Sequence, residues 1–384
     1  MQRVIRDSIP PTKREYLSFR AALSRGYPNA RNPFPACLDD VALLQFTGGT
    51  TGTPKCAMLT HRNLSSNVAQ IRTWLGAAFC SAPQIILTPL PLFHIFALTA
   101  SLLTFVEIGG HNVLVADPRN LAALVRNLRR TRPTALLGVN TLFNALLAAP
   151  HFDAVDWSRL RLVIGGGAAI QASVAARWQT ATGGPIIEGY GLTEASPVVC
   201  VNPMDAKRFS GSVGYPLPST EVSIRDDNSA EVAAGVVGEV WVRGPQVMRG
   251  YWMNPAETAE AISPDGWLRT GDLGYLTPTK MLVLVDRKKD VVIVSGFKVY
   301  PSEVEAVVSA FPGVSAAAIV GVPDEKTGQA VKLFVVPASA NLTAGALLEH
   351  CRTSLSAYKV PRFIEFRDHL PPNQLGKVLR RGLR

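Results

Sequence analysis

Cysteine is sparse in this 384-residue chain, and its placement follows no pairing pattern. The five cysteines, an odd number without the CxxC spacing of metal or redox sites, are Cys37, Cys56, Cys80, Cys200 and Cys351. Such usage excludes a disulfide framework and is typical of proteins from a reducing compartment. We therefore expect a cytoplasmic protein.

Long hydrophobic runs are missing as well. The longest run, residues 92–106, is interrupted by His94 and followed by Glu107, so it falls short of the about 20 residues that a membrane span needs. We interpret this run as a buried helix. Residues 1–12 carry basic side chains but no apolar stretch of the kind that a signal peptide contains.

Acidic residues are outnumbered by basic ones, 29 against 39, which gives the chain a net charge of +10. A basic chain can bind nucleic acid, but no recognition module with interleaved basic and aromatic residues is present, so we expect no nucleic-acid partner. Residues 287–384 hold 14 Lys and Arg against 8 Asp and Glu. This last quarter is the expected partner of a phosphorylated ligand or of an anionic membrane surface.

The first half of the chain has the pattern of an α/β domain. Residues 1–36 are polar and contain proline, with one short helix expected at residues 16–23, and look like a partial N-terminal segment. Residues 37–210 then alternate short apolar runs, such as 161–165, with longer helical patterns, such as 121–132. This alternation indicates a parallel sheet with helical crossovers.

The second half changes pattern twice. Residues 211–286 consist of short strands with Gly and Pro turns, which predicts a small antiparallel or barrel-like β-rich subdomain. Residues 287–384 return to mixed strands and helices and read as a separate C-terminal domain. Ser302 with Glu305 three residues on has the spacing of a capping box, so we expect a helix to open at Ser302.

A loop rich in glycine and threonine follows the apolar run 41–46. It reads Thr47, Gly48, Gly49, Thr50, Thr51, Gly52, Thr53, Pro54, Lys55. Glycines let backbone N–H groups turn toward an anion, hydroxyls add donors and a lysine adds charge, so the loop suits phosphate binding. It is not a Walker A loop, because Pro54 stands before the lysine and no Gly-Lys-Ser/Thr opens a helix. A plain surface loop is the alternative for this stretch taken alone.

Three further segments carry groups suited to a nucleotide. Gly165, Gly166 and Gly167 follow a predicted strand, where the backbone can approach a flat ligand closely, although a plain turn also explains them. The stretch Glu188, Gly189, Tyr190, Gly191, Leu192, Thr193, Glu194 supplies an aromatic face, a hydroxyl and a carboxylate. Glu194 suits Mg²⁺, which commonly takes one or two carboxylates plus substrate phosphates. Asp272 lies in a predicted tight turn, where it either caps the turn or accepts hydrogen bonds from ribose hydroxyls.

Taken in order, these segments resemble the adenylate-forming superfamily of acyl-CoA synthetases, luciferases and peptide-synthetase adenylation domains. The resemblance rests on TGGTTGTPK, PLPLFHIFALT, GYGLTEA, DGWLRTGD, DRKKDVVIVSGFKVYPSEVE and LGKVLRR. Within the superfamily, the chain is similar to the bacterial long-chain fatty-acid–CoA ligases. The implied fold is a large N-terminal α/β domain with a small β-barrel-like subdomain, plus a small mobile α+β C-terminal domain.

The resemblance implies a two-step reaction. A fatty acid would attack the α-phosphorus of ATP to give acyl-AMP and pyrophosphate, and coenzyme A would then take the acyl group and release AMP. The implied cofactors are ATP, Mg²⁺ and coenzyme A. Peripheral contact with an anionic membrane, at the inner face, and a homodimer stay open.

The resemblance also assigns residues. Thr47 to Lys55 would hold the β- and γ-phosphates, and Thr193 and Glu194 would act on the α-phosphate and Mg²⁺. The remaining assignments are Gly165, Gly166, Gly167, Glu188, Gly189 and Tyr190 for adenine; Asp272 and Arg287 for ribose; Lys377 for adenylation; Lys289 for the hinge; Ser295, Gly296, Phe297 and Lys298 for the pantetheine tunnel; and His94 for the gate of the acyl pocket. A solvated basic tail is the alternative for Lys377, and a buried core histidine is the alternative for His94.

The chain departs from the superfamily pattern in its phosphate loop, in the turn at residues 277–281, which lacks the usual glycine, and at its front. Cys56 follows the lysine of the phosphate loop, where glycine is usual, so we expect a stiffer or narrower loop. The superfamily also carries roughly 170 more residues ahead of this point, and without them apolar faces would lie exposed, which favours aggregation or partner binding. We therefore expect a fragment of a longer enzyme, or a chain completed by another. Activation of a different acid, and an inactive subunit that only binds nucleotide, are the alternative functions.

Overall fold

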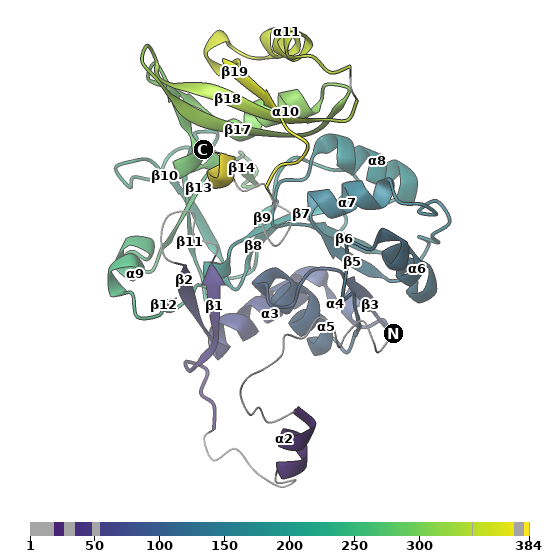
Figure 1. The fold of residues 1–384 in the computed structure, drawn as a ribbon. Helices are drawn as coiled ribbons and strands as arrows, with labels where there is room; N and C mark the ends of the chain where they lie inside the picture. The colour runs from purple at the N-terminus through teal and green to yellow at the C-terminus, as the bar shows by residue number, and fades with distance from the viewer. Residues whose placement is uncertain (1–18, 27–34, 48–53, 340, 372–379, 384) are drawn as a thin grey trace. The chain divides into compact units, whose positions relative to one another are not determined.

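The computed structural model describes residues 19–26, 35–47, 54–339, 341–371 and 380–383 (Figure 1). By its contacts the chain divides into two units, residues 1–38 and 39–384. The first unit contains α2 (Phe19–Arg25), in which no residue is buried. The helix expected at residues 16–23 overlaps α2, and its first three residues lie outside the described part.

A seven-stranded sheet forms the centre of the second unit, in the order β4-β3-β5-β6-β7-β8-β9. The first five strands in this order are parallel and the last two are antiparallel. The strands are β3 (Ile85–Thr88), β4 (His111–Leu114), β5 (Ala135–Gly138), β6 (Leu162–Gly165), β7 (Ile187–Gly191), β8 (Val198–Val201) and β9 (Tyr215–Pro216). The α/β fold expected from the alternating pattern is thus confirmed.

Helices cover both faces of this sheet. They are α3 (His61–Leu75), α4 (Ala77–Cys80), α5 (Thr104–Glu107), α6 (Leu121–Thr131), α7 (Asn140–Leu147) and α8 (Ala172–Thr182). Because successive strand residues point to opposite faces, Ile86 and Ile164 pack with Ile71 of α3, whereas Leu87 and Val163 pack on the side of α6, α7 and α8. Strands buried on both faces read as continuous apolar runs, which is why the strand pattern was visible in the sequence.

The expected buried helix at residues 92–106 is present but wound differently. Residues Phe96–Leu103 form a π-helix, η1, which continues into α5. The Thr104 hydroxyl donates to the Thr99 carbonyl at 2.8 Å, and Ser101 and Thr88 hydroxyls lie 2.6 Å apart. Side-chain hydroxyls thus satisfy polar groups inside an otherwise apolar segment.

Two antiparallel sheets accompany the central one. The smaller has the order β1-β2-β12, from β1 (Val41–Thr47), β2 (Lys55–Thr60) and β12 (Gly250–Tyr251). The other has the order β10-β11-β13-β14, from β10 (Glu221–Arg225), β11 (Gly238–Arg243), β13 (Leu268–Leu276) and β14 (Leu282–Arg287). The helix α9 (Pro255–Ala261) lies between β12 and β13 in the chain. The β-rich pattern expected for this region is therefore present as an open sheet.

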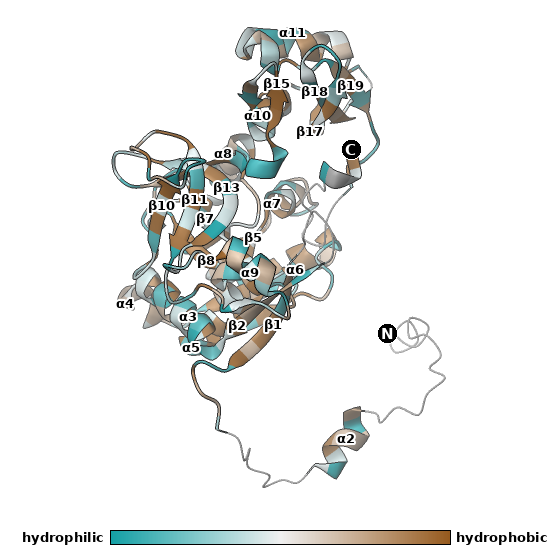
Figure 2. Cartoon of the chain, turned by 90° about the vertical axis from the view of Figure 1, so that its left-hand side faces the viewer, coloured by the Kyte–Doolittle hydropathy of each residue, from teal (hydrophilic) through white to brown (hydrophobic). Residues whose placement is uncertain are grey.

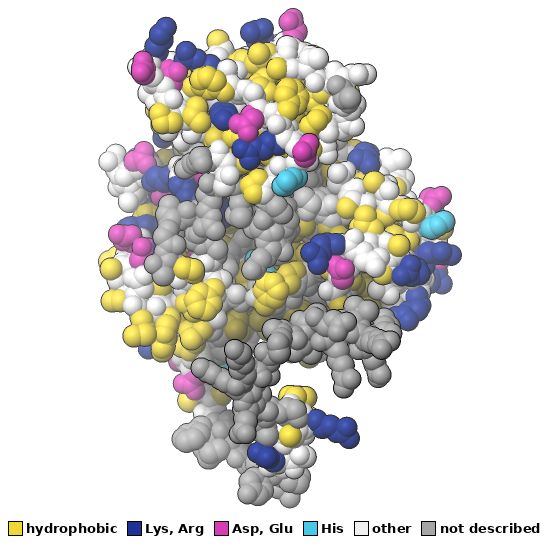
Figure 3. Space-filling model, in the orientation of Figure 1, with side chains coloured by type: hydrophobic (Ala, Val, Ile, Leu, Met, Phe, Trp, Pro, Cys, Tyr) yellow, Lys and Arg dark blue, Asp and Glu magenta, His cyan; other side chains and the backbone are white. Residues whose placement is uncertain are grey.

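The strand β1 is an apolar edge. No other described strand pairs with its outer side, and Phe46 is 66% exposed. Figure 2 shows β1 largely in the brown of hydrophobic residues, and Figure 3 shows hydrophobic side chains gathered over the region of β1 and β12. Trp252 and Met253, which follow β12, are also exposed.

The last part of the chain is built on a five-stranded sheet. Its strands are β15 (Val292–Val294), β16 (Phe297–Val299), β17 (Val314–Asp324), β18 (Gly328–Pro337) and β19 (Phe363–Phe366), of which β19 pairs with β18 in parallel. Its helices are α10 (Pro301–Ser309) and α11 (Ala344–Ser354), with short 3₁₀ turns η3 (Lys288–Asp290), η4 (Ala357–Lys359) and η5 (Arg380–Leu383). The helices α10 and α11 cover one face of this sheet, and Leu370 and Leu383 pack on the other.

The expected capping box at Ser302 is wrong. The helix α10 begins one residue earlier, at Pro301, and its N-cap Tyr300 makes no side-chain cap. Proline suits the first helical position because its fixed φ matches the helix and its missing N–H is not needed there. The Glu305 carboxylate instead accepts the Ile319 amide at 2.8 Å.

Candidate functional site

The candidate site begins where β7, β13 and β14 lie close together. The Tyr190 hydroxyl of β7 donates to Asp272 Oδ2 at 2.7 Å, and Arg287 Nε lies 3.2 Å from Asp272 Oδ1. Asp272 and Arg287 are register partners across β13 and β14, so backbone pairing sets their distance. Burial, together with the charge of Asp272, raises the pKa of Tyr190 well above its ordinary value, which keeps the phenol protonated as a donor.

A second polar cluster forms at the base of the expected phosphate loop. Strands β1 and β2 form a hairpin in which Thr47 pairs with Lys55. Residues 48–53, including Gly48, Gly49, Thr50, Thr51 and Gly52, lie outside the described part of the chain. Lys55 forms an ion pair with Glu257 of α9, and its ammonium lies 5.2 Å from the centre of the Tyr251 ring.

Tyr251 connects this cluster to Glu194. Its hydroxyl donates to Glu194 Oε1 at 2.9 Å, and the Met248 amide donates to the Glu194 carbonyl at 2.8 Å. Burial and the Glu194 charge raise the pKa of Tyr251 above its ordinary value. The expected phosphate and metal residues Lys55 and Glu194 are thus joined through a tyrosine that the sequence analysis missed.

Glu188 and the glycine triplet lie on neighbouring strands. The Ile170 amide donates to Glu188 Oε1 at 2.9 Å, and burial raises the pKa of Glu188 from 4.5 to about 7. Gly166 has the Phe96 ring so close that a Cβ there would lie 3.0 Å from it. Gly167 has a φ of +77°. These two positions need glycine, because a side chain would strain the backbone or displace the ring.

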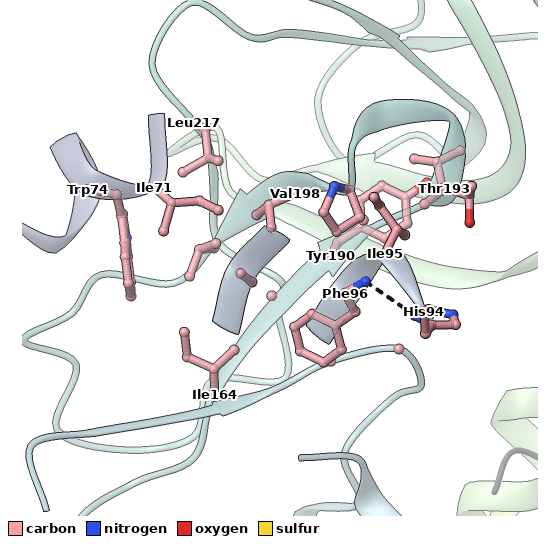
Figure 4. A pocket seen from close by; sticks show the side chains of 18 of the residues that line it. Ile71, Trp74, His94, Ile95, Phe96, Ile164, Tyr190, Thr193, Val198 and Leu217 are labelled. Carbon is pink, nitrogen blue, oxygen red and sulfur yellow. Dashed lines mark hydrogen bonds between the residues drawn. The ribbon is translucent and has the colours of Figure 1, made fainter. Parts of the chain in front are cut away.

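An apolar cavity opens beside these groups (Figure 4). Figure 4 shows Trp74, Ile71 and Leu217 toward one end of it and His94 and Thr193 toward the other. The lining also includes Leu75, Ile95, Phe96, Ala100, Phe105, Leu162, Ile164, Gly166, Gly167, Gly189, Tyr190, Gly191, Leu192, Pro197, Val198 and Val201. Tyr190 therefore belongs both to the apolar cavity, which its ring lines, and to the polar cluster, because its hydroxyl donates to Asp272.

His94 lies at the start of the π-helix. Its Nδ1 accepts the Phe96 amide at 3.2 Å, and its ring is half-buried on the lining of the cavity. His94 thus lies beside the cavity as expected for its gate, and the alternative of a core histidine is equally compatible with this geometry. The neighbouring Phe93 is 63% exposed.

The expected C-terminal residues fall into three places. Lys289 lies in η3, where burial lowers its pKa and the charges of Arg287 and Lys55 add to that effect. Ser295 and Gly296 have φ of +48° and +85° in the turn between β15 and β16, and Phe297 stacks on Tyr358 with ring centres 4.9 Å apart. Lys377 lies outside the described residues.

Cys56 is part of β2, one residue after Lys55. Its side chain is buried, and its carbonyl accepts the Trp252 amide at 2.8 Å. Burial raises the pKa of the Cys56 thiol, so it is an unreactive core side chain. The sequence expectation that Cys56 alters the phosphate loop is not tested by the described residues.

Metal ligands are few at the site. Among the described residues, no group of three or more His, Cys, Asp or Glu side chains is placed to hold a metal ion. Mg²⁺ is commonly held by one or two carboxylates together with substrate phosphates. A single carboxylate, that of Glu194, is therefore compatible with a Mg²⁺ site that the phosphates of a nucleotide complete. None of the helices in the described ranges could span a lipid bilayer.

The fold and these clusters have counterparts in a family of AMP-binding enzymes. Residues 4–252 match the family described as AMP-binding enzyme, and residues 303–377 match the AMP-binding enzyme C-terminal domain. The chain belongs to this family.

Individual relatives make the family assignment more specific. The chain is 49% identical over 368 residues to a long-chain-fatty-acid–CoA ligase of Yersinia pestis, covering 96% of this chain and 65% of that protein. Thus the chain spans about two thirds of the ligase's length. ATP-bound MatB from Rhodopseudomonas palustris superposes with a TM-score of 0.84 at 32% identity, covering 91% of this chain and 68% of that one. The o-succinylbenzoate CoA synthetase of Bacillus subtilis, in complex with its acyl-adenylate intermediate, superposes at 0.80 and 30% identity, covering 91% of this chain and 70% of that one.

Proposed function

We propose that this chain activates a long-chain fatty acid with ATP to form acyl-AMP and then transfers the acyl group to coenzyme A. The observation that carries the proposal is the double environment of Tyr190. An apolar cavity for an acyl chain and a carboxylate suited to ribose hydroxyls meet at this one side chain. The identity to long-chain-fatty-acid–CoA ligases supports the choice of acid.

The proposed nucleotide contacts run across the site. Asp272 accepts hydrogen bonds from the ribose hydroxyls while Arg287 holds its carboxylate in place. Adenine lies among Gly165, Gly166, Gly167, Glu188, Gly189 and Tyr190. Lys55 and the loop from Thr47 to Gly52 bind the β- and γ-phosphates.

The chemical step joins two anions, so the chain must supply positive charge. A carboxylate oxygen of the fatty acid attacks the α-phosphorus, and pyrophosphate leaves. Thr193 donates to an α-phosphate oxygen, and Lys377 neutralises the charge that develops between the carboxylate and the phosphate. Glu194, oriented by Tyr251, would hold Mg²⁺, and the cation would supply charge that neutralises the phosphates.

The second step uses the C-terminal part. The thiol of coenzyme A, as its thiolate, attacks the acyl carbon, the bond to phosphate breaks, and AMP leaves. We propose Lys289 as the hinge that permits the C-terminal part to rotate between the steps, and Ser295, Gly296, Phe297 and Lys298 as the lining of the pantetheine tunnel. His94 is proposed as the gate of the acyl cavity.

Two further properties belong to the proposal. The excess of basic residues in 287–384 favours peripheral contact with an anionic membrane. The apolar edge at β1 favours a contact with a second protein surface, for which a homodimer is the simplest case.

The test is palmitate-dependent ATP–pyrophosphate exchange by the purified chain with Mg²⁺. We expect exchange with palmitate, and its loss in Lys377→Ala, while that variant still forms thioester from preformed palmitoyl-AMP and coenzyme A. Exchange that responds to an aryl acid and not to palmitate would contradict the acid. Absence of exchange from folded wild-type protein would contradict the activity of this chain.

A further inference from the structure

A partly buried arginine near the end of the chain, Arg380, binds three carboxylates at once. Arg380 Nη2 and Nε contact Glu305 at 2.7 and 3.1 Å, and Nη1 lies 3.1 Å from Asp286 and 3.3 Å from Asp290. Its Nη2 is also 3.4 Å from the Ser302 hydroxyl. Burial alone would lower the pKa of Arg380, but the charges of Glu305, Asp286 and Asp290 raise it above its ordinary value.

Asp286 is the most enclosed member of the cluster. Its side chain is 2% exposed, and its Oδ2 accepts the Ser302 amide at 2.7 Å. Ser302 is the second residue of α10, so the carboxylate also lies at the positive end of that helix. Asp286 thus binds both α10 and the C-terminal tail.

The cluster joins parts of the chain that lie on different sheets. Asp286 belongs to β14 of the four-stranded sheet, whereas Ser302 and Glu305 belong to α10, which packs on the five-stranded sheet. The two sheets are connected through η3, which contains Lys289 and Asp290. Figure 1 shows the C-terminal end of the chain beside β14. The salt-bridge network therefore connects the two sheets at this point.

The same contacts connect the tail to the candidate site. Asp286 precedes Arg287, which pairs with Asp272, and Arg380 follows Lys377 by three residues. On the other side of Arg380, Leu383 is buried against Ala318, Val320 and Phe334. Residues 380–383 are therefore held by the ion pairs of Arg380 and by the apolar packing of Leu383.

We propose that Arg380 is a positioning residue that anchors residues 380–383, three positions after Lys377 in the chain, to the end of β14 that bears Arg287, and that the cluster holds the orientation used for acyl-AMP formation. The inference rests on the proposed function, because positioning Lys377 matters only if adenylate is formed. A rotation at Lys289 would separate Asp286, which precedes it, from Ser302, Glu305 and Arg380, which follow it. The cluster is thus expected to serve the first step and to open for the second.

The test measures the two half-reactions separately in Arg380→Gln. We expect kcat for palmitate-dependent exchange to fall about tenfold or more, because small displacements of a catalytic group are costly, with KM for ATP unchanged. Thioester formation from palmitoyl-AMP and coenzyme A should stay near the wild-type rate. Asp286→Asn should give the same split, and Arg380→Lys should recover part of the loss.

Arg367→Gln is the matched control, since it removes an ion pair with Glu365 at 2.7 Å in the same part of the chain. It should leave both half-reactions unchanged. Equal loss of both half-reactions in Arg380→Gln, or loss of neither, would overturn the proposal.

A second readout does not depend on activity. In the unliganded chain, Arg380→Gln should speed hydrogen exchange of the Ser302 and Leu383 amides while α11 keeps its protection. Unchanged hydrogen exchange at both amides would contradict the proposal that Arg380 holds residues 380–383 in place. If wild-type protein gives no pyrophosphate exchange, the proposed function fails, and the hydrogen-exchange comparison still decides whether Arg380 holds the tail.

Discussion

The apolar cavity and the polar cluster at Asp272 meet at Tyr190 but are built in opposite ways. The cavity is lined by core residues of α3, η1, β6 and β8 that also pack the central sheet. The Asp272 cluster consists of a few charged groups whose distance is set by strand pairing. Apolar burial scales with area and distinguishes acids by length, whereas paired charges orient a ligand. Under the proposed function, the choice of acid is therefore separate from the placement of the nucleotide.

Removing the charge at Asp272 should have the largest effect. In Asp272→Asn the ribose would lose a charged acceptor and Arg287 its partner, so we expect kcat/KM for ATP to fall by about 10²-fold. KM for palmitate should stay close to wild type, because the cavity is untouched. Pyrophosphate-exchange kinetics at varied ATP concentration measure kcat/KM for ATP. Asp226→Asn, which alters an exposed turn aspartate that accepts the Asn228 and Ala230 amides, is the control. Unchanged ATP dependence in Asp272→Asn would contradict the assignment.

Glu188 should make stability depend on pH. Its pKa is about 7 in the folded chain against 4.5 without burial, so between these values only the folded state holds the proton. The stabilisation is full below about pH 4.5 and is lost as the pH rises through 7, a change of about 3 kcal/mol. Urea unfolding of wild type and Glu188→Gln at several pH values isolates this contribution. As the pH rises, the free energy of unfolding of wild type should fall relative to that of Glu188→Gln. If the two free energies change with pH in the same way, the carboxyl is not buried and protonated.

Filling the cavity should change acid preference and leave the nucleotide end intact. Ile71 is 5% exposed at the end of the cavity near Trp74, and Ile71→Trp would displace about two methylenes of a long chain. At about 0.8 kcal/mol per methylene we expect KM for palmitate to rise about tenfold, with octanoate little affected. Ile71→Leu, which conserves volume, is the control. Equal changes for both acids would show that the cavity does not hold the acyl chain.

Freeing Lys55 should have the smallest effect. Its partner Glu257 is partly exposed, and such ion pairs contribute about 1 kcal/mol or less. Because Glu257 competes with phosphate for the lysine, Glu257→Gln should lower KM for ATP by up to about threefold. Glu260→Gln, in the same helix, is the control. A higher KM in Glu257→Gln would indicate that Glu257 supports nucleotide binding.

The polar residues of the candidate site were easier to predict from the sequence than the hydrogen bonds and ion pairs that join them. Tyr190, Glu188 and Asp272 lie in short, dense motifs, and the strands of the central sheet are continuous apolar runs because both faces are buried. Tyr251 was missed, because it reaches Glu194 only through the pairing of the two-residue strand β12 with β2. The Arg380 cluster was missed for the same reason, since its partners lie 75 to 94 residues away in the chain.

Local patterns also misled where tertiary contacts intervened. Ser302 and Glu305 have the spacing of a capping box, yet Asp286 accepts the Ser302 amide and Arg380 binds Glu305. The apolar run at residues 92–106 predicted a helix but not its π-winding, because hydroxyls of Thr104 and Ser101 bond inside the core. Asp286, Arg380 and Thr88 all lie outside the segments whose pattern was read, so the sequence pattern could not include these contacts.

The most direct test of the account is calorimetric binding of palmitoyl sulfamoyl adenosine, a non-hydrolysable acyl-adenylate analogue that spans both halves of the site. We predict that wild-type protein binds it more than about 10²-fold more tightly than the acetyl analogue, because the cavity buries the longer chain. Asp272→Asn should weaken both analogues by a similar factor. Equal affinity for the two analogues, or no effect of Asp272→Asn on either, would contradict a site in which the cavity and the Asp272 cluster bind the two ends of one ligand.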